Sequence, residues 1–162
     1  MKKLIIVRHS KSCWKDFSLT DFQRPLNKRG KFDGPLMANY LGCKINKIDY
    51  LHSSSSVRTF KTSKFFIKQI KFEKIEYDDL LYHCSSVSIL KMIRNYSDDF
   101  LSVLIIAHNP GLTNLINELT EISLDNLPTT GLAVVDFNCY NWKDISFKNS
   151  KLVDLKFPKQ LK

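Results

Sequence analysis

Short apolar runs alternate with amphipathic segments along this chain. Residues 3–8, 48–53 and 101–107 have the length of strands, and 101–107 is apolar except at Ser102, as in a central parallel strand. Residues 73–78 alternate between apolar and polar side chains and predict a further strand. Helices are expected over 28–41, from the Ser54–Ser56 caps to about 70, over 86–96 and over 111–120, with late strands at 131–137 and 151–157.

The order of these elements predicts the fold class. Alternating strands and helices indicate an α/β protein with a mostly parallel central sheet and helices on both faces. The two late strands leave an antiparallel arrangement open. A chain of 162 residues is one ordinary domain, so a single domain over 1–162 is expected.

The net charge of +9, from 25 basic and 16 acidic residues, raises the question of a nucleic-acid partner. Lysines account for most of the basic residues and are spread along the whole chain, and no RNP-like, zinc-finger or arginine-rich motif is present. Nucleic acid is therefore a disfavoured partner. A lysine-rich solvated surface is expected, and it is compatible with anionic ligands such as phosphate.

Neither the apolar runs nor the cysteines indicate a membrane or an oxidising compartment. No run approaches the ~20 residues of a membrane span, and the apolar core from Leu4 to Val7 is shorter than the ~7–15 residues of a signal peptide. The four cysteines are irregularly spaced and form no CxxC pair. We expect a cytoplasmic protein with reduced thiols and no metal site.

Polar side chains follow four of the predicted strands. Because ligands bind at the carboxyl ends of strands in such sheets, we expect these side chains to lie together. Two arginines offer planar donors to a phosphoryl group, a histidine is a nucleophile, a second histidine shares charge, and a carboxylic acid protonates a leaving group. The candidates are Arg8 and His9, Arg58, Asp78 and Asp79, and His108 and Asn109.

Several motifs resemble those of the histidine phosphatase superfamily, which has the phosphoglycerate mutase-like fold. VRHSKSCW is similar to its Arg-His-Gly signature, with Ser12 and Trp14 in the expected places. SSSSVRTFKT and LIIAHNPGL resemble the segments of the second arginine and second histidine, and RPLNKRGKFDGPLMANYL resembles the small branch that includes the SixA phosphohistidine phosphatases. The resemblance covers roughly residues 3–137, in the expected order.

This resemblance implies a phosphatase without a metal, a cofactor or a large cap domain. His9 would be phosphorylated, and Arg8, Arg58 and His108 would hold the phosphoryl group. Water would then release inorganic phosphate from His9. Ser12 is a further candidate for a hydrogen bond to phosphate.

The chain departs from the family pattern at two places. Ser10 replaces the glycine of Arg-His-Gly, which excludes a strict need for a glycine backbone there. The usual glutamate after the third strand is missing. Asp79, just before Leu-Leu-Tyr-His, resembles the small branch's acidic residue and is the favoured general acid, with Asp78 and Glu76 as alternatives; His83 lies nearby.

Three functions remain open from the sequence. The short chain leaves little material for a lid, which favours phosphohistidine presented on a protein surface as the substrate. A phosphatase of small phosphorylated metabolites on the same scaffold is the first alternative. A phosphate- or nucleic-acid-binding module without turnover is the second.

Overall fold

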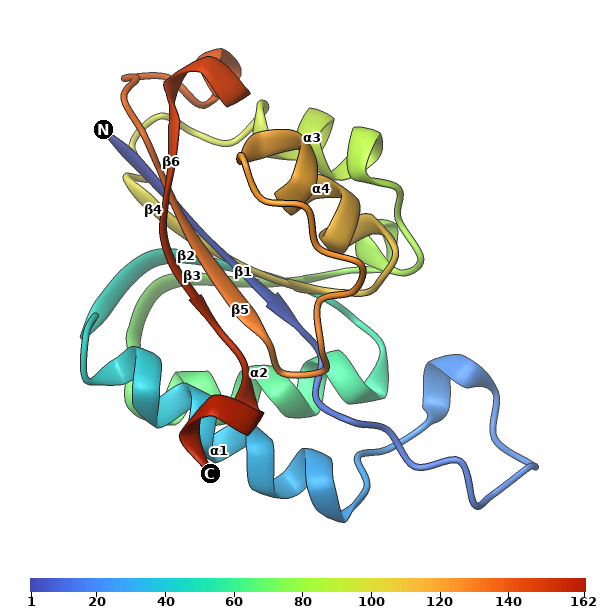
Figure 1. Ribbon diagram of the computed structural model, residues 1–162. Coiled ribbons are helices and arrows are strands. Elements are labelled where there is room, and N and C mark those ends of the chain that lie inside the picture. The colour runs from blue at the N-terminus through green and yellow to red at the C-terminus, as the bar shows by residue number, and fades with distance from the viewer.

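A six-stranded sheet crosses the molecule in the order β3-β2-β4-β1-β5-β6 (Figure 1). The computed structural model describes residues 1–162. Its strands are β1 (Lys2–Arg8), β2 (Lys47–Ser54), β3 (Lys71–Asp78), β4 (Ser102–Ala107), β5 (Leu132–Phe137) and β6 (Ser150–Lys156). The first four strands are parallel, whereas β5 is antiparallel to both β1 and β6. The predicted mostly parallel α/β sheet is confirmed, and the late strands add its antiparallel edge.

Two layers of helices cover the sheet. The helices are α1 (Lys28–Gly42), α2 (Val57–Gln69), α3 (Ser86–Ile93) and α4 (Gly111–Leu119). Helices α1 and α2 lie on one face and α3 and α4 on the other (Figure 1). Alternate side chains of β4 face opposite layers, so Leu104 packs with the first pair of helices and Ile105 with the second. This two-sided burial explains why β4 is apolar from Val103 to Ala107.

Polar side chains start three of the helices. Asn27, Ser56 and Ser85 each accept a hydrogen bond from a backbone N–H of the first helical turn. Helix α3 ends at Ile93, three residues before the predicted end, because the chain turns there and brings the Tyr96 hydroxyl to His52. None of the helices combines the length and apolar character that a membrane crossing requires.

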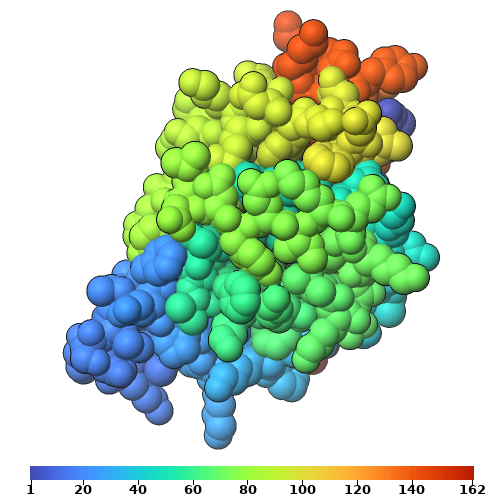
Figure 2. Space-filling model, turned by 180° about the vertical axis from the view of Figure 1, so that it is seen from behind, coloured from blue at the N-terminus to red at the C-terminus, as the bar shows by residue number.

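The loop between β1 and α1 extends away from the sheet and its helices (Figure 1). It contains a short 3-10 helix, η1 (Asp21–Gln23), where the sequence predicted only loop. Figure 2 shows the molecule from behind, where the blue residues of this loop border the green residues of α2 and of the segment after β3. The loop therefore forms one side of any site at the carboxyl ends of the parallel strands.

Candidate active site

Side chains from three strand ends surround one cavity of about 190 Å³. Arg8 ends β1 and His9 follows it, Arg58 lies in the first turn of α2 after β2, and His108 follows β4. Ser12, from the loop after β1, also lines the cavity. The structure thus brings together the predicted arginines and histidines with Ser12, but not the predicted acids Asp78 and Asp79.

His9 lies at the floor of the cavity as a neutral imidazole. Only 7% of the residue is exposed, and its Nδ1 lies 2.8 Å from the Ser10 carbonyl oxygen. A carbonyl only accepts, so Nδ1 carries the proton and Nε2 keeps a lone pair. Burial, with Arg58 and Arg8 nearby, lowers the pKa of His9 to about 3. The imidazole is therefore unprotonated at neutral pH, as a nucleophile must be.

The two arginines bring positive charge to the walls. Arg8 donates from Nη1 to the Leu127 carbonyl at 2.8 Å, and its buried Nε has no partner. Arg58 donates from Nη1 to the Asp21 carbonyl at 2.7 Å and from Nη2 to the Asp21 carboxylate at 3.0 Å. Two planar guanidinium groups beside a nucleophile suit a tetrahedral oxyanion such as phosphate.

His108 is also neutral in this arrangement. Its Nδ1 accepts from Arg58 Nη2 at 3.3 Å, and its Nε2 lies 2.8 Å from the Ser54 hydroxyl. Burial, followed by the nearby His9 and Arg58, lowers the pKa of His108 to about 2. A phosphoryl dianion in the cavity would counter the arginine charge and favour the protonated form of this ring.

Ser10 fits its position without backbone strain. Its φ lies outside the left-handed region, so glycine is not needed there. The Ser10 N–H donates to Thr62 Oγ1 at 2.9 Å, and the Thr130 hydroxyl donates to Ser10 Oγ at 2.9 Å. Thr130 is the strained residue, with φ of 60°, and its N–H lies 3.1 Å from the carbonyl oxygens of both Arg8 and His9. Ser10 therefore ties the nucleophile segment to α2 and to the turn before β5.

The structure places the predicted acids outside the cavity. Asp79 is exposed and accepts from the Ser55 hydroxyl. Asp78 caps the turn after β3 by accepting from the Leu80 N–H at 2.8 Å, and Glu76 pairs with Lys74 at 2.6 Å. The assignment of Asp79 as the acid therefore rests on the sequence alone.

Asp21 is the carboxylate that does line the cavity. Its Oδ2 accepts hydrogen bonds from Arg58, from the Tyr82 hydroxyl and from His83 Nε2. Burial raises the pKa of Asp21, but these hydrogen bonds outweigh burial and lower it to about 2. Sequence reasoning missed Asp21 because it follows no strand, and its only signal is its place just before Arg24 and Pro25.

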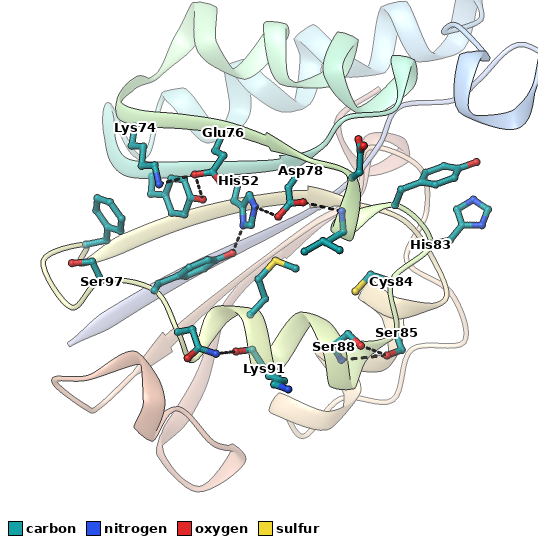
Figure 3. Close-up of a pocket in the computed structure, with 18 residues that line it drawn as sticks. His52, Lys74, Glu76, Asp78, His83, Cys84, Ser85, Ser88, Lys91 and Ser97 are labelled. Carbon is teal, nitrogen blue, oxygen red and sulfur yellow. Dashed lines mark hydrogen bonds and ion pairs between the residues drawn. The ribbon is translucent and has the colours of Figure 1, made fainter.

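A larger groove of about 1100 Å³ adjoins this cavity, between β2 and β3 on one side and α3 on the other (Figure 3). Within it, His52, Glu76 and Asp78 offer atoms within 4.8 Å of one another, as a metal site would require. Hydrogen bonds already account for these side chains, because His52 bonds to Tyr96 and Asp78, and Glu76 pairs with Lys74. The groove meets the phosphate-sized cavity at His83, which lines both.

Comparison with known proteins finds distant relatives along most of the chain. No known family model matches. An uncharacterized chloroplastic protein of Arabidopsis thaliana is 26% identical over 88% of this chain and 70% of its own length. An uncharacterized protein of Mycobacterium leprae is 24% identical over 94% of this chain and 100% of its own length.

Solved structures agree more closely in shape. A structure from Agrobacterium tumefaciens, provisionally assigned as the phosphohistidine phosphatase SixA, superposes with a TM-score of 0.82 at 24% identity, covering 97% of this chain and 98% of that one. The protein histidine phosphatase SixA complexed with tungstate gives 0.75 at 23% identity, over 99% of both chains. A phosphoserine phosphatase of Entamoeba histolytica gives 0.65 at 15% identity, over 100% of both chains. The chain has the fold of these phosphatases, so the fold that the motifs predicted is confirmed.

Proposed function

We propose that this chain, which folds like the SixA-type phosphatases, is itself a metal-independent phosphatase that works through a phosphorylated His9. The observation that carries the proposal is the geometry of His9. Its Nε2 is unprotonated at the floor of a cavity, and Arg8, Arg58 and His108 line the cavity walls. A neutral nucleophile beside two fixed cations matches what transfer of a phosphoryl dianion requires.

The reaction has two steps. His9 Nε2 attacks phosphorus, a P–N bond forms, and the bond from phosphorus to the leaving group breaks with its electron pair going to that group. Water then attacks phospho-His9, the P–N bond breaks, and inorganic phosphate leaves while His9 regains its lone pair. Arg8 and Arg58 stabilise the charge on the equatorial oxygens in both steps, with Ser12 as a further donor.

The favoured substrate is a phosphohistidine on another protein, in the cytoplasm. Support comes from the small cavity, whose volume of about 190 Å³ suits a phosphoryl group and leaves the rest of the substrate outside. The adjoining groove offers room for a polypeptide around the phosphorylated side chain. A small phosphorylated metabolite is the alternative substrate, in keeping with the phosphoserine phosphatase of the same fold.

Trapping the intermediate tests the proposal. Wild type incubated with a phosphohistidine protein and quenched in alkali should carry phosphate on His9, identified by peptide mass spectrometry. His9→Ala should lose both the label and at least about 10³-fold in turnover. Tyr140→Ala, at an exposed residue that lines neither the cavity nor the groove, is the control and should keep the label. Phosphate binding without any label or turnover would indicate a binding module instead.

A panel of substrates separates the two phosphatase alternatives. A phosphohistidine protein, phosphoserine and sugar phosphates are compared by kcat/KM with the same enzyme preparation. A preference for the protein is expected. A preference for a small ester would assign the metabolite role and leave the mechanism through His9 intact.

A further inference from the structure

We propose that His83, held by Asp21, is the group that gives a proton to the leaving group and later takes one from water, an inference that rests on the proposed phosphatase function. A leaving group departs as a poor anion unless it is protonated as its bond to phosphorus breaks. The predicted acids lie outside the phosphate cavity, so this work needs another residue.

The position of His83 meets the geometric demand of the reaction. In an in-line displacement the leaving group lies opposite the nucleophile. His9 lies buried at the floor, so the leaving group must point to the mouth, and the side chain of His83 is 59% exposed there. His83 is also the single residue that lines both the cavity and the groove, at the end of the groove in Figure 3. A substrate that occupies both the groove and the cavity therefore lies beside His83.

The orientation of His83 is fixed by its neighbours. Its Nε2 lies 3.1 Å from Asp21 Oδ2, and since that carboxylate is ionised it accepts the Nε2 proton. Nδ1 is left without a protein partner, free to face a substrate. The Tyr82 ring packs against it at 4.1 Å between centroids, and the His108 ring lies 5.7 Å away.

The backbone of His83 supports a functional role. Its φ of 53° lies in the left-handed region, which is unfavourable for a non-glycine residue and persists only where the surroundings hold it. Such strain is concentrated at functional sites. Here it delivers the ring to Asp21 and to the mouth of the cavity.

The proton balance closes over the two steps. In its proton-carrying form, His83 gives its Nδ1 proton to the leaving atom as the bond to phosphorus breaks. The neutral ring then accepts a proton from the attacking water as the P–N bond of phospho-His9 breaks. His83 returns to its starting form, and the sum is hydrolysis of the substrate to inorganic phosphate.

Two other proton donors fit the structure less well. The Tyr82 hydroxyl also reaches Asp21, but it lines the groove and not the cavity. Asp79 lies in the groove as well and accepts from the Ser55 hydroxyl. Of these three groups, His83 is the one that lines the cavity, and its Nδ1 has no protein partner.

The test compares leaving groups rather than overall rates. His83→Asn keeps a residue that tolerates positive φ but removes the titratable ring. For an alkyl phosphate its kcat/KM should fall about 10²–10³-fold, whereas for p-nitrophenyl phosphate, whose leaving group needs no proton, it should fall less than about fivefold. Because hydrolysis of phospho-His9 also slows, a pre-steady-state burst of nitrophenolate should appear. Asp21→Asn should show the same selectivity to a smaller degree, and circular dichroism confirms folding of both.

The outcomes separate this inference from the proposed function. If wild type releases nitrophenolate through phospho-His9 but His83→Asn loses both substrates equally, or neither, the role of His83 is overturned and the phosphatase stands. A selective loss in Asp79→Asn alone would assign the acid to Asp79. If wild type neither turns over p-nitrophenyl phosphate nor forms phospho-His9, both proposals fall.

Discussion

Three of the four histidines are buried, and burial lowers the pKa of each. Two of them, His9 and His108, belong to the cavity, and their pKa values fall to about 3 and about 2. The unfolded chain binds protons at these rings below about pH 6.5, whereas the folded chain does not. The neutral His9 ring that the proposed reaction requires therefore lowers the stability of the folded chain in mild acid.

The free energy of unfolding should fall as the pH drops below about 6.5. At pH 5 each of these two histidines should remove about 2 kcal/mol relative to pH 8, because the unfolded state gains a proton that the folded state excludes. Urea unfolding at a series of pH values measures the loss. In the His9→Asn variant, the loss of unfolding free energy that His9 and His108 cause between pH 8 and pH 5 should be about half as large. An unchanged pH dependence in that variant would show that His9 is not buried as a neutral ring.

At the scale of elements, the start of α1 braces the loop that carries His9. Asn27 donates its N–H to the Lys11 carbonyl at 3.0 Å, and Ser12 pairs with Leu26 in an isolated bridge. Gly30 packs so closely on this loop that a methyl group there would overlap the Lys11 carbonyl oxygen. The missing side chain at Gly30 thus sets how near the loop lies to the helix.

Gly30→Ala should destabilise the protein by about 1–3 kcal/mol, because the added methyl group forces helix and loop apart. It should also lower kcat, since the loop continues directly from His9. Gly42→Ala, at the other end of α1, is the matched control. Its methyl group meets the Gln69 Cβ at 3.0 Å, which a small shift relieves, so stability should change by less than about 1 kcal/mol. Thermal unfolding and steady-state kinetics compare the two, and equal effects would show that Gly30 has no special contact with the loop.

Strands and helices are predicted well from the sequence where buried apolar side chains recur at regular intervals along them. An apolar run such as residues 101–107 can be buried on both sides only inside a sheet, so it predicts a central strand. Arg58 and His108 then follow the ends of two predicted strands, which is how the sequence locates them. Asp21 escapes prediction because it lies in the short 3-10 helix of a long loop, and the role of His83, which the sequence places only near the candidate acid, escapes it because His83 lies in a turn. Their positions depend on contacts with each other and with Arg58, and no periodicity along the chain records such contacts.

The whole molecule carries a net charge of +9, and the cavity contains two arginines. A field of this sign attracts phosphorylated partners over distances of about a Debye length, ~10 Å at 0.1 M salt. If the chain acts on phosphorylated partners as proposed, the lysines spread over the surface should contribute to the encounter rather than to the chemistry.

For a phosphorylated, acidic protein substrate, kcat/KM should fall by on the order of tenfold between 20 and 300 mM KCl, because salt screens the encounter. The kcat should change much less, since Arg8 and Arg58 act at contact distance. Stopped-flow and steady-state assays at several salt concentrations measure both. A kcat/KM independent of salt would show that the surface charge plays no part in encounter.

Thr130 donates hydrogen bonds to Ser10 and to the carbonyl oxygens of Arg8 and His9. These bonds connect the start of the chain to a turn about 120 residues later. During synthesis His9 leaves the ribosome early, whereas Thr130, which supports it, leaves late. A nascent chain that ends before β5 already contains Arg8, His9, Arg58 and His108, yet it lacks the strand beside β1 and the turn that holds His9. Activity should therefore arise in one late step of translation, and incomplete chains should not consume phosphorylated partners.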